Sequence, residues 1–109
     1  EGYTGKTSIG VIIRGKKDGK PMTKMLYNVS DHAETNKEVS AQAVSYTTGV
    51  PPVSGAKMFF TGVWSGKGVF NVEQFPAKPF LDDLAKRGLP TTIVDLTEKD
   101  QAELFAVKT

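Results

Sequence analysis

The sequence predicts an α+β fold in which three helices pack on an antiparallel or mixed sheet. Apolar residues alternate with polar ones in the first third of the chain, which is typical of strands, and helix-capping signals follow in the middle. The expected order is strand, strand, helix, helix, short strand, helix, strand. At 109 residues, the chain has the size of one domain.

The first two strands are predicted to form a β-hairpin. Ile9, Val11 and Ile13 alternate with smaller or polar residues, and a second alternation runs over residues 25–29. Asp18-Gly19 lies between the two runs, and such a pair readily adopts the positive φ angles of a tight hairpin turn.

Two helices are expected next. Asp31-His32-Ala33-Glu34 has the form of a capping box and predicts a helix over about residues 32–47, which Gly49 ends. A second helix is expected to begin at Pro51-Pro52. Proline lacks a backbone N–H, but the first N–H groups of a helix have no helical acceptor, so no hydrogen bond is lost there. The predicted apolar face of this second helix consists of Val53, Ala56, Phe60 and Val63.

The remaining elements are a short strand or extended run within residues 69–75, a third helix and a β-branched strand over residues 91–96. The signals for the third helix are Pro79 near its start, Asp82 and Asp83 in its first turn, and Gly88 as its C-cap. Residues 1–6 are interpreted as a linker or severed end, residues 7–96 as the domain, and residues 97–109 as a tail that could form a short helix. Because the chain opens on Glu1, we expect a piece of a longer protein.

Composition excludes several classes of function. Fourteen basic and 12 acidic side chains give a net charge of +2 without a basic stripe, so no nucleic-acid partner is expected. No uncharged stretch is apolar enough to predict a membrane span. The absence of cysteine excludes thiol chemistry and cysteine metal sites, and no other metal site is predicted. Because cysteine-free chains fit a reducing compartment, a cytoplasmic location is expected. No Gly-x-Gly-x-x-Gly follows a strand, so this chain carries no cofactor-binding residues of its own.

The sequence also contains a series of short motifs: Asp31-His32, residues 46–52, Gly55-Ala56, Gly62-Val63-Trp64, residues 68–75, Pro79-Phe80-Leu81 and Gly88-Leu89-Pro90. Together they resemble the C-terminal domain of the saccharopine dehydrogenase-like reductases over roughly residues 7–94. Residues 68–75 and 79–90 are most similar to the carboxynorspermidine branch of that family.

The resemblance implies a substrate-binding and dimerisation domain that lacks its Rossmann partner. Enzymes of this family condense an amine with an aldehyde and reduce the imine with NADPH, which the missing Rossmann domain would hold. In the carboxynorspermidine branch, the aldehyde is aspartate β-semialdehyde and the amine is a short diamine. A homodimer with small-molecule substrates is therefore expected, in polyamine or lysine metabolism, and the fragment alone should be inactive.

Substrate binding is predicted for Tyr46, Thr47, Thr48 and Gly49, at the expected junction between two helices, and for His32. For each residue a structural alternative stays open: the threonines and Gly49 could simply cap a helix, and His32 could be a capping-turn residue. A single helix would separate His32 from Tyr46 by roughly 21 Å, so one small imine could not touch both. We therefore favour the Thr47 to Gly49 end, and no catalytic residue is assigned.

Two weaker candidates are Glu73, which could attract an ammonium group or simply face solvent, and Tyr27, which is expected in the core. Phe59, Phe60 and Trp64 are expected to serve packing or dimer contacts. The alternative class of function is a stand-alone α+β interaction or regulatory domain. A Gly-x-Gly-x-x-Gly segment encoded upstream of Glu1 would favour the enzyme over this alternative.

Overall fold

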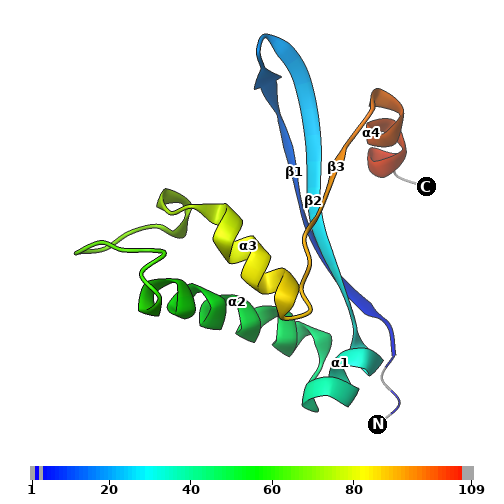
Figure 1. Cartoon of the computed structure of the whole chain (residues 1–109). Helices are drawn as coiled ribbons and strands as arrows, with labels where there is room; N and C mark the ends of the chain where they lie inside the picture. The colour runs from blue at the N-terminus through cyan, green and yellow to red at the C-terminus, as the bar shows by residue number, and fades with distance from the viewer. Residues whose placement is uncertain (1, 3, 107–109) are drawn as a thin grey trace.

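The chain forms a long antiparallel hairpin, with three of its helices gathered toward one end and the C-terminal helix beside the other half (Figure 1). The computed structural model describes residues 2 and 4–106. Residues 1 and 3 of the predicted linker and residues 107–109 of the predicted tail lie outside the described residues.

The sheet has three strands in the order β1-β2-β3, and both pairings are antiparallel. β1 (Lys6–Lys17) pairs with β2 (Lys20–Asp31) along its whole length, and β3 (Thr92–Asp95) pairs with residues 24–27 of β2. The turn residues Asp18 and Gly19 have φ angles of 51° and 78°. These are the positive φ angles of a type I′ turn, so the predicted hairpin is confirmed.

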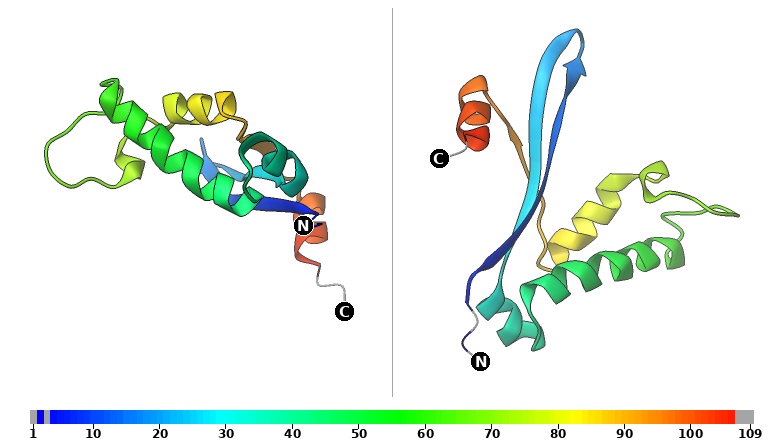
Figure 2. Two further views of the ribbon diagram at one scale, coloured as in Figure 1. Left: turned by 90° about the horizontal axis from the view of Figure 1, so that it is seen from below. Right: turned by 180° about the vertical axis from the view of Figure 1, so that it is seen from behind.

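The four α-helices of the described residues are α1 (His32–Val39), α2 (Ala43–Phe60), α3 (Ala77–Lys86) and α4 (Glu98–Phe105). The predicted α+β class is therefore confirmed. α2 and α3 lie side by side near the end of the hairpin that leads into α1, whereas the hairpin turn stands clear of them (Figures 1 and 2). α4 follows β3 in the predicted tail, and the predicted domain limits stay a prediction.

The predicted boundary between the first two helices is wrong. The helix breaks at Ser40, which takes a left-handed conformation with φ of 54°, rather than at Gly49. α2 then continues through Pro51 and Pro52. Each proline deprives the carbonyl four residues earlier of its helical partner, at a cost of about 3 kcal/mol. Burial along the continuous helix offsets this cost, through Ala43, Thr47, Ser54 and Met58.

The predicted buried face of the second helix is also wrong. Val53 and Phe60 are exposed, Phe60 by 91%, whereas the buried stripe lies on another side of the helix. α2 carries one charged residue, Lys57, among its 18 residues, so no charged face marks its exposed side. Hydrophobic periodicity does not identify a buried face in such a helix.

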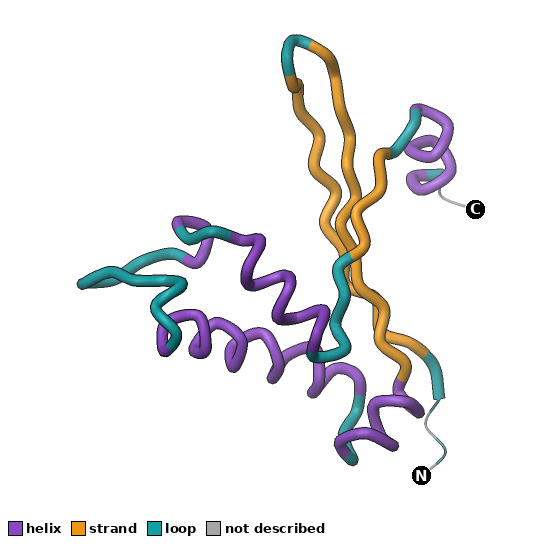
Figure 3. Tube along the Cα trace, in the orientation of Figure 1, coloured by secondary structure: helices purple, strands orange, loops and turns teal. Residues whose placement is uncertain are grey.

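Residues 69–75, predicted as a short strand or an extended run, do not form a strand. This segment belongs to a long loop between α2 and α3, which ends in a single 3-10 turn, η1 (Val72–Gln74) (Figure 3). The loop is held by Trp64, which is 3% exposed and stacks on Phe75 with ring centroids 5.1 Å apart. The Trp64 indole N–H donates to the Pro76 carbonyl at 3.0 Å. Aromatic packing therefore replaces strand pairing in this segment.

The chain exposes more surface than a compact monomer of its size. Its accessible area is 8382 Å², whereas about 5,900 Å² is typical of a folded monomer of 11.8 kDa. The radius of gyration is 17.0 Å, against about 13 Å for a compact domain of this length. Much of the exposed surface is apolar and includes Ile9, Val11, Ile13 and Ile93 on one face of the sheet. Such a shape is typical of a domain that packs against further protein.

Candidate functional site

The candidate site lies where α1 ends, α2 begins and α3 ends. Asp31 caps α1: its carboxylate accepts from the backbone N–H groups of Ala33 and Glu34 at 2.8 and 3.1 Å. The hydrogen bond from Glu34 is the main cause that lowers the pKa of Asp31. The predicted helix start is therefore confirmed, and it fixes the position of the next residue, His32.

His32 is buried and connects the two helices. Its Nδ1 accepts a hydrogen bond from the backbone N–H of Ala43, the first residue of α2, at 3.2 Å. The other ring nitrogen, Nε2, lies 3.4 Å from the hydroxyl of Thr7 on β1. Because Nδ1 accepts, Nε2 carries the proton of a neutral ring and donates to Thr7. The ring therefore joins α1, α2 and β1.

The separation of roughly 21 Å expected between His32 and Tyr46 assumed that one helix carries both residues. The break at Ser40 places them on different helices. The two residues do not lie on one straight helix, because α2 turns back and its first amide meets His32. They nevertheless line different cavities. His32 lines one of about 530 Å³ with the N-terminal segment, and Tyr46 lines another of about 380 Å³.

Tyr46 lies one turn into α2 and is half-buried. Its hydroxyl donates to the backbone carbonyl of Arg87, the residue after α3. Burial is the main cause that raises the pKa of Tyr46, and the nearby Glu38 carboxylate raises it further. The phenol therefore joins α2 to the end of α3.

The two threonines are placed differently from Tyr46. Thr47 is buried, and its hydroxyl donates to the Val44 carbonyl at 3.2 Å. Thr48 is exposed and donates to the same carbonyl at 2.7 Å. Both hydroxyls are thus bonded within α2. Because α2 is continuous here, the amides near residue 49 do not open a helix, and the predicted carboxylate site at a helix start has no counterpart in the structure.

The cavity beside Tyr46 is an open apolar cleft. Gly49 is exposed at its floor, and a side chain built there would meet no atom within 4 Å. A glycine inside a helix costs about 1 kcal/mol relative to alanine. No contact within the described chain requires Gly49, which leaves room on this side of α2 for a ligand or for further protein. The cleft is lined by Val39, Ala41, Ser45, Tyr46, Gly49, Val50, Val53 and Arg87.

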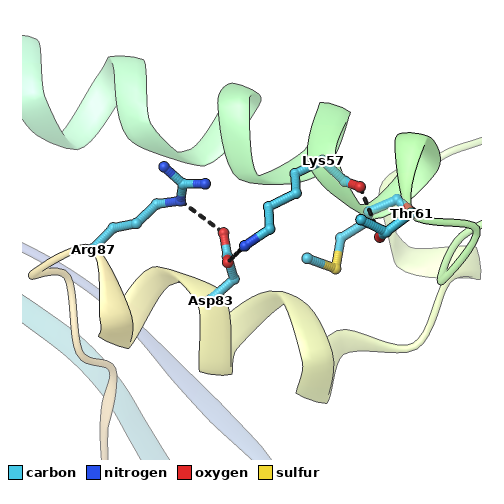
Figure 4. Close-up of polar contacts among 5 residues, drawn as sticks. Lys57, Thr61, Asp83 and Arg87 are labelled. Atoms are coloured by element: carbon cyan, nitrogen blue, oxygen red, sulfur yellow. Dashed lines mark hydrogen bonds and ion pairs between the residues drawn. The ribbon is translucent and has the colours of Figure 1, made fainter.

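A charged cluster beside this cleft was not predicted from the sequence. Asp83 is buried between α2 and α3, where it binds Lys57 of α2 and Arg87, whose Nε lies 2.7 Å from the carboxylate (Figure 4). Hydrogen bonds from Arg87 first, and then from Lys57, hold the pKa of Asp83 below its ordinary value. α3 begins at Ala77, so Asp83 does not lie in its first turn as predicted. The sequence did contain a signal for this pair: Asp83 and Arg87 are four residues apart, which places their side chains next to each other on one face of a helix.

The weaker candidates lie away from the cleft. Tyr27 pairs with Gly10 in the sheet, and Glu73 is exposed in η1. In the described ranges, no group of three or more acidic or histidine side chains is placed to hold a metal ion. Over the same residues, no helix is both long and apolar enough to cross a membrane.

This α+β domain, with its exposed apolar sheet face, belongs to the saccharopine dehydrogenase C-terminal domain family, whose model matches residues 2–89. The chain is 47% identical over 95 residues to a carboxynorspermidine synthase of Vibrio alginolyticus, covering 87% of this chain and 23% of that protein. It is 51% identical over 90 residues to a carboxyaminopropylagmatine dehydrogenase of Synechocystis, covering 83% and 23%. A carboxynorspermidine synthase of Vibrio cholerae is 43% identical over 107 residues, covering 98% and 26%.

These comparisons confirm the family inferred from the short motifs. They also show that the chain spans about a quarter of the length of these relatives. The described residues form no parallel β-α-β unit, because every strand pairing among them is antiparallel. They therefore do not form the Rossmann-type phosphate site, in which a parallel strand leads into a helix.

Proposed function

We propose that this chain is the substrate-binding domain of a nicotinamide-dependent reductase that joins an amine to an aldehyde. The supporting observation is family membership, together with relatives named carboxynorspermidine synthase and carboxyaminopropylagmatine dehydrogenase. The amine and the aldehyde lose water to form a C=N bond, and addition of hydride to carbon and a proton to nitrogen gives the secondary amine. The rest of the protein would supply the nicotinamide, with NADPH as the proposed donor.

We place the substrate in the cleft beside Tyr46 and Gly49. Its volume of about 380 Å³ falls within the usual range of small-molecule sites, roughly 300–1,000 Å³. Thr47, Thr48 and His32 do not line this cleft. The hydroxyls of the two threonines are bonded within α2, and the His32 ring joins α2 to β1. The proposed contribution of this chain is to bind and orient the substrate.

The test uses the full-length protein with aspartate β-semialdehyde and either 1,3-diaminopropane or agmatine. We expect oxidation of NADPH that requires both the aldehyde and one of the amines, because neither alone contains a C=N bond to reduce. The product should contain a new secondary amine, which mass spectrometry detects. Failure to oxidise either NADPH or NADH with any such pair would contradict the proposed function.

We also propose that the protein is a homodimer that covers the apolar sheet face of Ile9, Val11, Ile13 and Ile93. In light scattering, the full-length protein should have twice the mass of one chain. Val11→Asp should shift it to the monomer, because the substitution places a charge in the interface. Ser8→Asp is the matched control, since Ser8 is exposed on the opposite face of β1. A dimer unchanged by Val11→Asp would contradict the use of this face.

A further inference from the structure

The cleft beside Tyr46 combines apolar walls with a single charged side chain. Val39, Val50 and Val53 contribute hydrocarbon surface, and Arg87 is the only charged residue among those that line the cleft. The backbone of Arg87 is fixed at this place, because its carbonyl accepts the hydrogen bond from the Tyr46 hydroxyl. The Arg87 side chain is 36% exposed, so a small molecule can reach it from solvent.

The guanidinium of Arg87 is only partly used within the domain. Its Nε donates to Asp83 at 2.7 Å, whereas Nη1 and Nη2 form no hydrogen bond within the described part of the chain. A guanidinium has five N–H donors, so the four on Nη1 and Nη2 remain for another acceptor. Figure 4 shows this group extending from the end of α3 toward α2. Asp83 therefore holds the guanidinium by one edge and leaves the other edge open.

The charges around this group favour an anion. Lys57 and Arg87 carry two positive charges, and the carboxylate of Asp83 that they share supplies one negative charge. Each cation binds a different oxygen of that carboxylate. One positive charge therefore remains unbalanced within this cluster of three side chains. At the edge of an apolar cleft, such a charge attracts an opposite charge more strongly than it would in bulk water.

A carboxylate on a short hydrocarbon chain matches these features. Its two oxygens can accept from Nη1 and Nη2 together, in the two-pronged geometry by which guanidinium groups bind carboxylates. Its methylene groups would lie along the three valines, where their burial is favourable. Gly49 leaves the floor of the cleft open for such a chain. An ammonium group fits less well, because the lining of the cleft contains no acidic residue.

We propose that Arg87 binds the carboxylate of the aldehyde substrate and thereby selects an amino-acid aldehyde over a simple one. The proposal rests on the proposed function and makes it more specific, because the carboxylate of aspartate β-semialdehyde takes no part in imine formation. The α-ammonium group would lie at the open mouth of the cleft, in water. The aldehyde carbon would point away from Arg87, toward the amine and the nicotinamide.

The kinetic test compares two aldehydes that differ only in the carboxylate, aspartate β-semialdehyde and 3-aminopropanal, with the full-length protein and the amine that supports turnover. Arg87→Gln should raise KM for aspartate β-semialdehyde about tenfold, as expected for loss of charge-assisted hydrogen bonds at a partly exposed site. Arg87→Lys should restore part of this loss, because lysine keeps the charge but not the planar fork. KM for 3-aminopropanal should be the same in all three proteins.

Lys57→Gln is the matched control, because Lys57 is the other cation bound to Asp83 but does not line the cleft. It should disturb the same cluster and leave KM for both aldehydes unchanged. An unchanged KM for aspartate β-semialdehyde in Arg87→Gln would overturn the proposal. An equal rise in Lys57→Gln, or with 3-aminopropanal, would also overturn it, since either would reflect a general disturbance of α2 and α3.

Ligand-observed NMR titration of the full-length protein separates this proposal from the proposed function. The probes are three unreactive analogues of aspartate β-semialdehyde. L-2-Aminobutyrate has a methyl group in place of the aldehyde, butyrate also lacks the ammonium group, and propylamine lacks the carboxylate instead. Both carboxylates should bind, with affinity about tenfold lower in Arg87→Gln, and propylamine should not displace them.

That result supports the site even if no imine is reduced, in which case the proposed function fails and the carboxylate site stands. If imines are reduced but Arg87→Gln has no effect, the proposed function stands and the site fails. If neither carboxylate binds the wild-type protein, another part of the protein covers the cleft and the proposal is overturned. Displacement of butyrate by propylamine would likewise overturn it, because the cleft would then not select a carboxylate.

Discussion

Replacing Trp64 by alanine should strongly destabilise this domain. The indole is buried and stacks on Phe75, and it also packs against Phe59 and Phe80, with ring centroids 5.6 and 5.4 Å away. Removing a buried tryptophan costs about 3–5 kcal/mol, through lost burial and the cavity left behind. The measurement is urea unfolding of the full-length protein, followed by circular dichroism.

Trp64→Phe is the control for this prediction. Phenylalanine keeps an aromatic ring in the cluster but loses the indole N–H that donates to the Pro76 carbonyl. We expect a smaller loss, on the order of 1 kcal/mol for the missing hydrogen bond, plus a contribution from the smaller ring. If alanine and phenylalanine shift the unfolding midpoint equally, the aromatic cluster does not hold the loop.

The second large effect is expected for Asp83→Ala, which removes the acid shared by Lys57 and Arg87. The pair with Lys57, which joins α2 to α3, is lost together with the pair between Asp83 and Arg87 at the end of α3. Lys57 and Arg87 are partly exposed and can be hydrated afterwards, which limits the loss. We expect the melting temperature of the full-length protein to fall by roughly 5 °C.

Asp82→Ala is the matched control, because Asp82 precedes Asp83 but forms an exposed pair with Lys78. Exposed pairs of this kind contribute little, so the melting temperature should hardly change. Equal effects of the two substitutions would contradict the role assigned to Asp83.

The lowered pKa of Asp83 determines how the stability of the folded protein should change with pH. Its pKa in the folded protein is below the ordinary carboxyl value of about 4. The unfolded chain therefore binds this proton more readily. The stabilisation is fully present above about pH 5 and is lost as pH falls through the folded pKa. The difference in melting temperature between wild type and Asp83→Ala should accordingly be smaller at pH 3 than at pH 7.

Local signals predicted the hairpin and the ends of several elements. Asp18-Gly19 determines its own turn, and Asp31 caps α1 with its own side chain, so neither depends on distant residues. Gly88 likewise ends α3 with a positive φ of 83°. These predictions were right because each physical cause lies within a few residues of its effect.

The helix break and the buried face of α2 could not be predicted in this way. Ser40 adopts a left-handed conformation without the glycine that usually signals one, and His32 caps α2 from 11 residues away. Since α2 has no charged face, only its neighbours decide which side is buried. The predicted junction at Gly49 was wrong for the same reason, because burial on both sides of Pro51 and Pro52 outweighs the local cost of the prolines.

The sequence by itself determined the family and the class of fold, and the role of the segment around Tyr46 and Gly49 in substrate binding stays a prediction. Tertiary structure decided which of those residues line the cleft, since Thr47 faces the interior and His32 lines a different cavity. It also brought Asp83 of α3 to Lys57 of α2. The physical reason is that turns and caps arise from neighbouring residues, whereas burial and charge pairing depend on how whole helices pack.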